Sequence, residues 1–267
     1  MDGDTRSSSL GAPLDNGLWN GPLGAAMRPI SFLRTRSIIT NGLTLYLDAF
    51  DSRSYSGGST WFDLSGNNFH FTINPLAFSR AGDIPHMNFN GSAGAAKRVV
   101  GGANVDVPNA INGTIMVFTS ILNSTADWRT LTRGVSGDHQ GMIQQGSNVL
   151  GMYDNNSNQF VSAGFDITSL PNPYTQFNCL TIRLSQNSPF YQFQYNNDQR
   201  IFSITNANAT FNNGFGMIGA GPSGNNADPN STVQFWGRIS VFIYYQRHLL
   251  QEEIAQNFNA LRSRYGI

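Results

Sequence analysis

Short runs of alternating apolar and polar residues, separated by turn residues, constrain the fold of this chain most. The segment LTLYLD, residues 43–48, places three leucines on one side of an extended chain and polar or aromatic residues on the other. This period of two is typical of a half-buried strand. Many short strands joined by polar turns predict an all-β fold, an antiparallel sandwich or jelly roll. Further candidate strands follow at residues 85–90, 113–122, 141–145, 148–153, 178–184, 189–195, 215–219 and 237–245.

One hairpin and one helix stand out in this pattern. The segment FNCLTIRLSQNSPFYQFQYNNDQR, residues 177–200, contains two alternating runs joined at residues 186–188, with another turn at residues 196–198. Residues 248–266 alone have helical spacing. Their predicted apolar stripe is Leu250, Ile254, Phe258 and Leu261, and Gly266 is the expected stop.

Residues 1–39 differ from the rest and predict an extended N-terminal arm, followed by one domain over residues 40–267. Gly, Pro and Ser interrupt the segment, and its apolar residues follow no period. Ordering such a segment costs about 1–2 kcal/mol per residue, so another surface would have to supply the burial. The alternative is a floppy tail whose arginines merely solvate it. The candidate anchoring residues are Leu18, Trp19, Arg28, Ile30, Phe32, Arg34 and Arg36.

Charge and cysteine content narrow the choice of partners. Sixteen basic and sixteen acidic residues give a formal net charge of zero, so no overall field steers the molecule toward nucleic acid or an anionic membrane. We expect neither as a partner. Cys179, the single cysteine, cannot form an intrachain disulfide or a cysteine-based metal site, which fits assembly in a reducing cytosol.

Three segments carry a family resemblance: NGLTLYLDAFDSRSYSGGSTWFDLSGNN, then MNFNG, and finally GRISVFIYYQRHLLQEEIAQNFNALRSRYGI. Together they resemble the laminin-G-like, concanavalin A-like lectin/glucanase domains of structural proteins of bacteriophages and other large viruses, over about residues 40–267. The resemblance implies a concanavalin A-like jelly roll of two antiparallel sheets with a short C-terminal helix. A fold of this kind does not imply one activity.

The segment WFDLSGNNFH, residues 61–70, has two interpretations. As a structural clasp, Trp61 covers an open end of the core while Asp63 and Ser65 bind main-chain groups of the turn. As a sugar platform, Trp61 stacks on a ring while Asp63 and Asn67 bind hydroxyls. The full set of candidate glycan-binding residues is Tyr55, Trp61, Asp63, Asn67, Trp128 and Tyr153.

Catalytic and metal motifs are weak. Concanavalin-like glucanases resemble one another in a Glu-x-Asp-x-x-Glu strand, which is absent, and the only glutamates, Glu252 and Glu253, are adjacent in the expected helix. The four histidines are isolated and have no metal-binding spacing. We therefore expect no catalytic residues and no cofactor. A weak calcium candidate remains at Asp154, Asn156 and Asn158, which lacks the Gly and closing Glu of a typical calcium loop.

These observations favour a non-enzymatic virion structural protein, a capsid decoration or tail component fastened by its arm. Its partners would be major capsid or tail subunits or copies of itself, and its location the virion, assembled in the host cytoplasm. The alternative is a glycan-binding adhesion module that recognises host surface polysaccharide. A glycan-cleaving enzyme is a third, weaker interpretation.

Overall fold

The structure is a computed structural model. It describes residues 37–80, 83–89, 96–108, 112–121, 128–134, 139–144, 147–154, 159–205, 214–219, 235 and 237–267. By its internal contacts the chain divides into two units, residues 1–35 and 36–267. The predicted anchoring residues, from Leu18 to Arg36, all lie outside the described residues.

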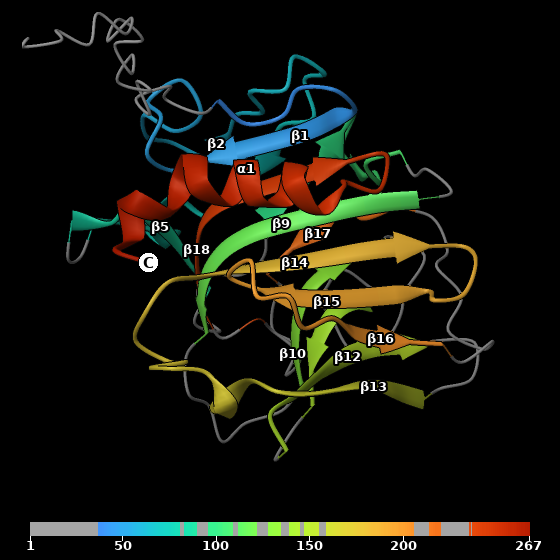
Figure 1. Cartoon of the computed structure of the whole chain (residues 1–267). Helices are drawn as coiled ribbons and strands as arrows, with labels where there is room; N and C mark the ends of the chain where they lie inside the picture. The colour runs from blue at the N-terminus through green and yellow to red at the C-terminus, as the bar shows by residue number, and fades with distance from the viewer. Residues whose placement is uncertain are drawn as a thin grey trace, which may run out of the picture. The chain divides into compact units, whose positions relative to one another are not determined.

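The first sheet is antiparallel. It consists of β1 (Leu43–Asp48), β4 (Phe78–Ser79), β5 (His86–Phe89), β9 (Asn112–Ile121), β14 (Asn178–Ser185), β15 (Tyr191–Tyr195), β16 (Phe202–Ile204) and β18 (Gly237–Tyr245). Their order is β16-β15-β14-β9-β18-β5-β4, and β1 also pairs with β18 (Figure 1). The predicted hairpin is the β14–β15 pair, and the turn after it contains Asn196 and Asn197, both with positive φ.

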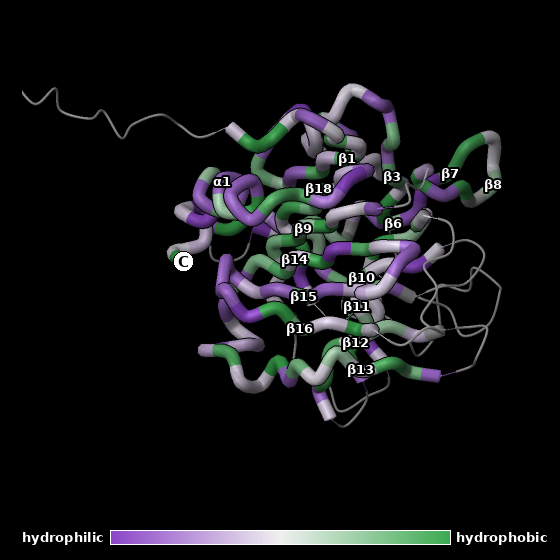
Figure 2. Tube along the Cα trace, turned by 45° about the vertical axis from the view of Figure 1, so that its right-hand side comes forward, coloured by the Kyte–Doolittle hydropathy of each residue, from purple (hydrophilic) through white to green (hydrophobic). Residues whose placement is uncertain are grey.

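The second sheet is also antiparallel and lies opposite the first. It consists of β2 (Thr60–Trp61), β3 (Phe71–Thr72), β6 (Ala96–Lys97), β10 (Arg129–Arg133), β11 (His139–Ile143), β12 (Val149–Asp154), β13 (Gln159–Asp166) and β17 (Met217–Ile218). Their order is β13-β12-β11-β10-β17-β6-β3-β2. A separate pair, β7 (Val99–Val100) and β8 (Ala103–Asn104), projects from the body (Figure 2). Among the described residues, short 3-10 helices lie at Pro75–Ala77, Ile167–Ser169 and Arg262–Tyr265.

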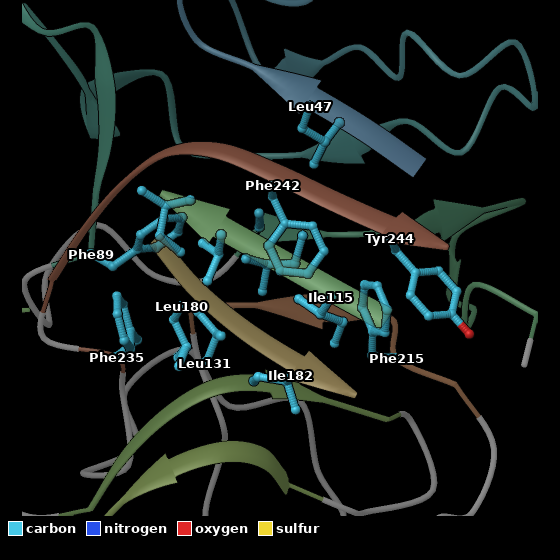
Figure 3. Packing of buried hydrophobic residues seen from close by; sticks show 14 of the residues in the cluster. Leu47, Phe89, Ile115, Leu131, Leu180, Ile182, Phe215, Phe235, Phe242 and Tyr244 are labelled. Carbon is cyan, nitrogen blue, oxygen red and sulfur yellow. The ribbon is translucent and has the colours of Figure 1, made fainter. Parts of the chain in front are cut away.

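The main core fills the space between the two sheets. Leu180 and Phe242 come from the first sheet, whereas Leu131 comes from the second, and Figure 3 shows these side chains converging. Gly141 on β11 shows how closely the sheets approach, since a Cβ atom there would lie 2.8 Å from Cδ1 of Ile182 on β14. The burial of both inner faces confirms the predicted jelly-roll sandwich.

A second apolar cluster lies on the other face of the first sheet, beneath helix α1 (Gln251–Leu261) (Figure 1). Ile254, Phe258 and Leu261 are buried there as predicted. Leu250 is instead 60% exposed, because it precedes the helix in an extended conformation and Leu249 takes the buried place. Of the helices that the structure describes, none is long and apolar enough to cross a membrane.

Residues 37–39 belong to this second layer rather than to an arm. The main-chain N–H of Ile39 donates to Oδ1 of Asn257 at 2.7 Å, and the Tyr245 hydroxyl donates to the Ile39 carbonyl at 2.8 Å. Gln256 also donates to the carbonyl of Ser37. These bonds tie residues 37–39 to the strand β18 and helix α1 of the domain.

Candidate functional site

Trp61 and Tyr55 are structural in their placement. The Trp61 side chain on β2 is 0% exposed and belongs to the main core. Tyr55 is also buried, packs on Phe78 with ring centroids 4.6 Å apart, and donates its hydroxyl to the carbonyl of Gly58. Neither ring presents a face on which a sugar could stack, which favours the clasp interpretation of this segment.

Asp63 organises the turn that follows. Its carboxylate accepts hydrogen bonds from the main-chain N–H groups of Tyr46 at 2.9 Å, Ser65 at 2.9 Å and Phe69 at 3.0 Å. The Ser65 hydroxyl donates a fourth bond at 2.7 Å. One buried carboxylate thus ties β1 to both ends of the SGNN turn, as a clasp requires.

Asn67 joins the same network from the turn. Its amide donates to the carbonyl of Thr44 at 3.0 Å and, at 3.3 Å, to that of Leu43. It also lines a cavity of about 350 Å³ together with Phe69 and Gln246. The structure therefore joins Asp63 and Asn67 through Ser65 in one internally bonded turn, whereas Trp61 lies in the main core.

Trp128 and Tyr153 lie elsewhere, on the outer face of the second sheet. Trp128 directly precedes β10, and Tyr153 lies on β12 with its centroid 6.4 Å from that of Trp128. Phe160 on β13 is the cross-strand partner of Tyr153, and its ring centroid is 5.3 Å from that of Trp128. All three side chains are partly exposed. We call Trp128, Tyr153 and Phe160 the aromatic surface.

Polar and apolar groups adjoin the aromatic surface on the same sheet. Gln140 and Met142 on β11 are buried but belong to neither core cluster. The Thr132 hydroxyl of β10 donates to the side-chain oxygen of Gln140 at 3.1 Å. Nε2 of Gln140 is buried and has no hydrogen-bond partner. A buried amide donor without an acceptor is rare in proteins and marks a place where a ligand oxygen would be stabilised.

Phe160 and Gln140 are absent from the residues expected from sequence. A signal for Phe160 exists in QFVSAGFD, where Phe160, Ser162 and Gly164 alternate with Val161, Ala163 and Phe165. Its glycine and serine weaken the apolar period, so the strand went unrecognised. Gln140 carries no sequence signal, because its significance depends on burial.

Ion pairs neutralise some of the charged groups in the described structure. Asp48, fully buried, pairs with Arg264 at 2.7 Å, and Glu253 pairs with Arg247 at 2.7 Å. The side-chain hydrogen bond from Arg247 holds the pKa of Glu253 below its usual value. Burial lowers the pKa of His86, whose Nδ1 lies 2.7 Å from the Ile84 carbonyl oxygen.

The calcium candidate stays a prediction. Asn156 and Asn158 lie outside the described residues, and only the backbone of Asp154 is described, at the end of β12. Within the described ranges, no group of three or more His, Cys, Asp or Glu side chains could hold a metal ion.

The fold matches solved structures, whereas no family model and no curated protein matches the sequence. A Trypanosoma rangeli sialidase superposes with a TM-score of 0.53 at 13% identity, over 86% of this chain and 35% of the sialidase. The same sialidase as a covalent intermediate with 2,3-difluorosialic acid gives 0.53 at 12%, over 86% and 34%. A botulinum neurotoxin type C structure, concerned with two ganglioside molecules, gives 0.48 at 16%, over 84% and 52%.

These matches define a class of fold and nothing finer. The chain spans about a third of the length of the sialidases that it matches. Together with the two facing antiparallel sheets and the C-terminal helix, the sialidase matches show a jelly-roll β-sandwich fold.

Proposed function

We propose that this domain is a non-enzymatic glycan-binding module and that its aromatic surface is the sugar platform. The observation that carries the proposal is the convergence of Trp128, Tyr153 and Phe160, from separate segments, into one partly exposed cluster. Two of the three were expected as glycan contacts from the sequence.

The chemistry of the surface suits a sugar ring. A pyranose has an apolar face of C–H groups, which packs on aromatic rings, and a rim of hydroxyls, which need hydrogen-bond partners. The buried Nε2 of Gln140 is a donor without an acceptor on the same sheet, beside the Thr132 hydroxyl. The lectin-like fold is a supporting analogy only, because one fold hosts many functions.

The test is a glycan-binding measurement on single variants of the aromatic surface. Truncation of an aromatic anchor costs about 2 kcal/mol or more in binding free energy, which is about 30-fold in Kd. We expect losses of this size for Trp128→Ala and Phe160→Ala against polysaccharides that bind the unaltered protein. Phe62→Ala is the matched control, since Phe62 is 39% exposed and contacts His70 away from this surface.

The outcome that contradicts the proposal is equally clear. If Trp128→Ala and Phe160→Ala both bind glycan as the unaltered protein does, or if no glycan in a broad panel binds, the aromatic surface is not a sugar platform. Circular dichroism of each variant must first show an unchanged fold.

The non-enzymatic part of the proposal has its own test. The glucanase carboxylate motif is absent from the sequence, and Glu253 of the glutamate pair is bonded to Arg247 and to the Leu250 main-chain N–H. We expect no new reducing ends after incubation with host polysaccharides. Turnover that a single Asp→Asn substitution abolishes would overturn this expectation.

A second candidate function is the virion structural protein expected from sequence. One observation favours it: the bonds from Asn257, Tyr245 and Gln256 fix residues 37–39 to the domain, so the segment before them starts from an anchored point. Such a segment could fasten the domain to a capsid or tail subunit. Deleting residues 1–36 should then abolish particle attachment while the domain stays folded. Attachment that survives the deletion would refute the role of the arm.

A further inference from the structure

A cavity of about 320 Å³ lies on the α1 side of the first sheet, on the sheet face that points away from the main core. The residues that line it are Arg238 on β18, Ile84, Tyr265, and Asn172, Thr175, Gln176 and Phe177 of one loop. Figure 1 shows the C-terminal end of the chain close to β5 and β18. Its volume is at the lower end of the range usual for small-molecule sites, so it could hold one small ring.

Arg238 is the one charged side chain among the described residues that line this cavity. Its partly exposed guanidinium has no hydrogen bond or ion pair with any described residue. The other arginines near helix α1 are engaged: Arg264 with Asp48, and Arg247 with Glu253. An arginine in a hollow without a counter-ion is a ready partner for a planar anion, because its fork of N–H donors matches a carboxylate.

A second polar group without a hydrogen-bond partner lies on β5, the strand next to β18. Asn88 on β5 is the cross-strand neighbour of Arg238, and such neighbours share one face of a sheet. The buried Oδ1 of Asn88 accepts no hydrogen bond. Arg238 lines the cavity, whereas Asn88 is not among the residues that line it, so a ligand carboxylate there would meet the guanidinium rather than the Asn88 oxygen.

The wall of the cavity suits the hydroxyl groups of such a ligand. The loop is held over the sheet because the Ser120 hydroxyl donates to the Tyr174 carbonyl and the main-chain N–H groups of Thr175 and Gln176 donate to that of Asn172. These bonds leave the side chains of Asn172, Thr175 and Gln176 without a described partner at the cavity. Phe177 and Tyr265 supply an apolar edge.

We propose that this cavity is a second binding site, specific for a monosaccharide unit that carries a carboxylate, with Arg238 as its anion-binding residue. The carboxylate pairs with the guanidinium, and the hydroxyls bond to the loop side chains. The site is distinct from the aromatic surface, which lies on the other sheet. The proposal for this cavity does not depend on whether the aromatic surface binds a sugar.

The experiment is an NMR titration of the full chain with glucuronic acid, glucose and inorganic phosphate. Glucose differs from glucuronic acid in lacking the carboxylate, and phosphate is an anion without a sugar ring. We expect glucuronic acid alone to shift the main-chain amides of residues 175–177 and the Nε–H of Arg238. Arg238→Gln should weaken binding about tenfold or more, because it removes charge-assisted hydrogen bonds.

Two further variants complete the test. Arg238→Lys keeps the charge but loses the planar fork, so binding should be intermediate. Arg53→Gln removes an exposed arginine that pairs with Asp51 and should leave the amide shifts unchanged. Equal shifts with glucose or phosphate, unchanged binding in Arg238→Gln, or loss of binding in Arg53→Gln would each overturn the proposal.

Discussion

Replacing Asp63 with alanine tests whether the WFDLSGNN turn is structural. The carboxylate accepts four hydrogen bonds, three of them from the main-chain N–H groups of Tyr46, Ser65 and Phe69. Each such bond contributes about 1 kcal/mol net, and bonds to a charged acceptor more. Asp63→Ala should therefore lower the free energy of unfolding by about 4 kcal/mol. For a domain of this size that corresponds to a Tm lower by about 8–16 °C.

Thermal melting followed by circular dichroism measures the change, and two variants calibrate it. Asp63→Asn keeps one acceptor oxygen and should fall between Asp63→Ala and the unaltered protein. Asp166 is an exposed aspartate that accepts only from Thr168 at the start of a 3-10 helix, so Asp166→Ala should cost about 1 kcal/mol. If Asp63→Ala melts within 2 °C or so of the unaltered protein, water replaces these bonds and the clasp reasoning is wrong.

Three further predictions follow from buried or paired side chains. Trp61→Ala should cost about 3–5 kcal/mol of stability, because the indole is fully buried; an unchanged melting midpoint with lost sugar binding would instead restore the platform interpretation. Glu253 has a pKa lowered below 4.5 by Arg247, so its contribution is present above pH 4.5 and lost as the pH falls through the lowered value. The difference in Tm between the unaltered protein and Glu253→Gln should accordingly shrink in acid, and a difference that stays constant down to the acid limit would contradict this. Burial raises the pKa of the Cys179 thiol to about 12, so a thiol reagent should label native protein only as fast as it unfolds; rapid labelling in the absence of denaturant would show that the site opens locally.

The strands that the sequence predicts well are those with one consistently apolar face. The expected strand at residues 237–245 matches β18, and the one at 113–122 differs from β9 by one residue at each end. Strand β10, RTLTR, was missed because it has no such face. Its leucine lies between two buried arginines, and its threonines are buried as well.

Local irregularities within a strand also cannot be predicted from the alternation of apolar and polar residues. The three leucines of β1 were expected on one face, but a register shift between Leu43 and Leu45 places Leu43 against the second cluster while Leu45 and Leu47 enter the main core. Nothing in the sequence marks this bulge, since it depends on how β1 pairs with a strand about two hundred residues away.

The candidate site was likewise predictable from the sequence only in part. Sequence indicates which residues are aromatic or polar, yet Trp61 and Trp128 cannot be told apart until their burial is known. The partnership of Trp128 with Phe160 depends on the pairing of β12 with β13, and the isolation of Arg238 depends on a loop that folds back over the sheet. These are tertiary properties, so only the residue types could be predicted.

The position of β18 has a consequence for how the protein is made. This strand lies in the middle of the first sheet, paired with β9, β5 and β1, although it follows the other described strands in sequence. Until the ribosome has released residues 237–245, β9 lacks one of its two neighbours and β1 lacks the strand with which it pairs. We therefore expect this domain to remain incompletely folded until β18 has emerged, with apolar strand edges exposed for as long as that takes. Chaperones that shield such edges are the cellular factors on which its yield should depend.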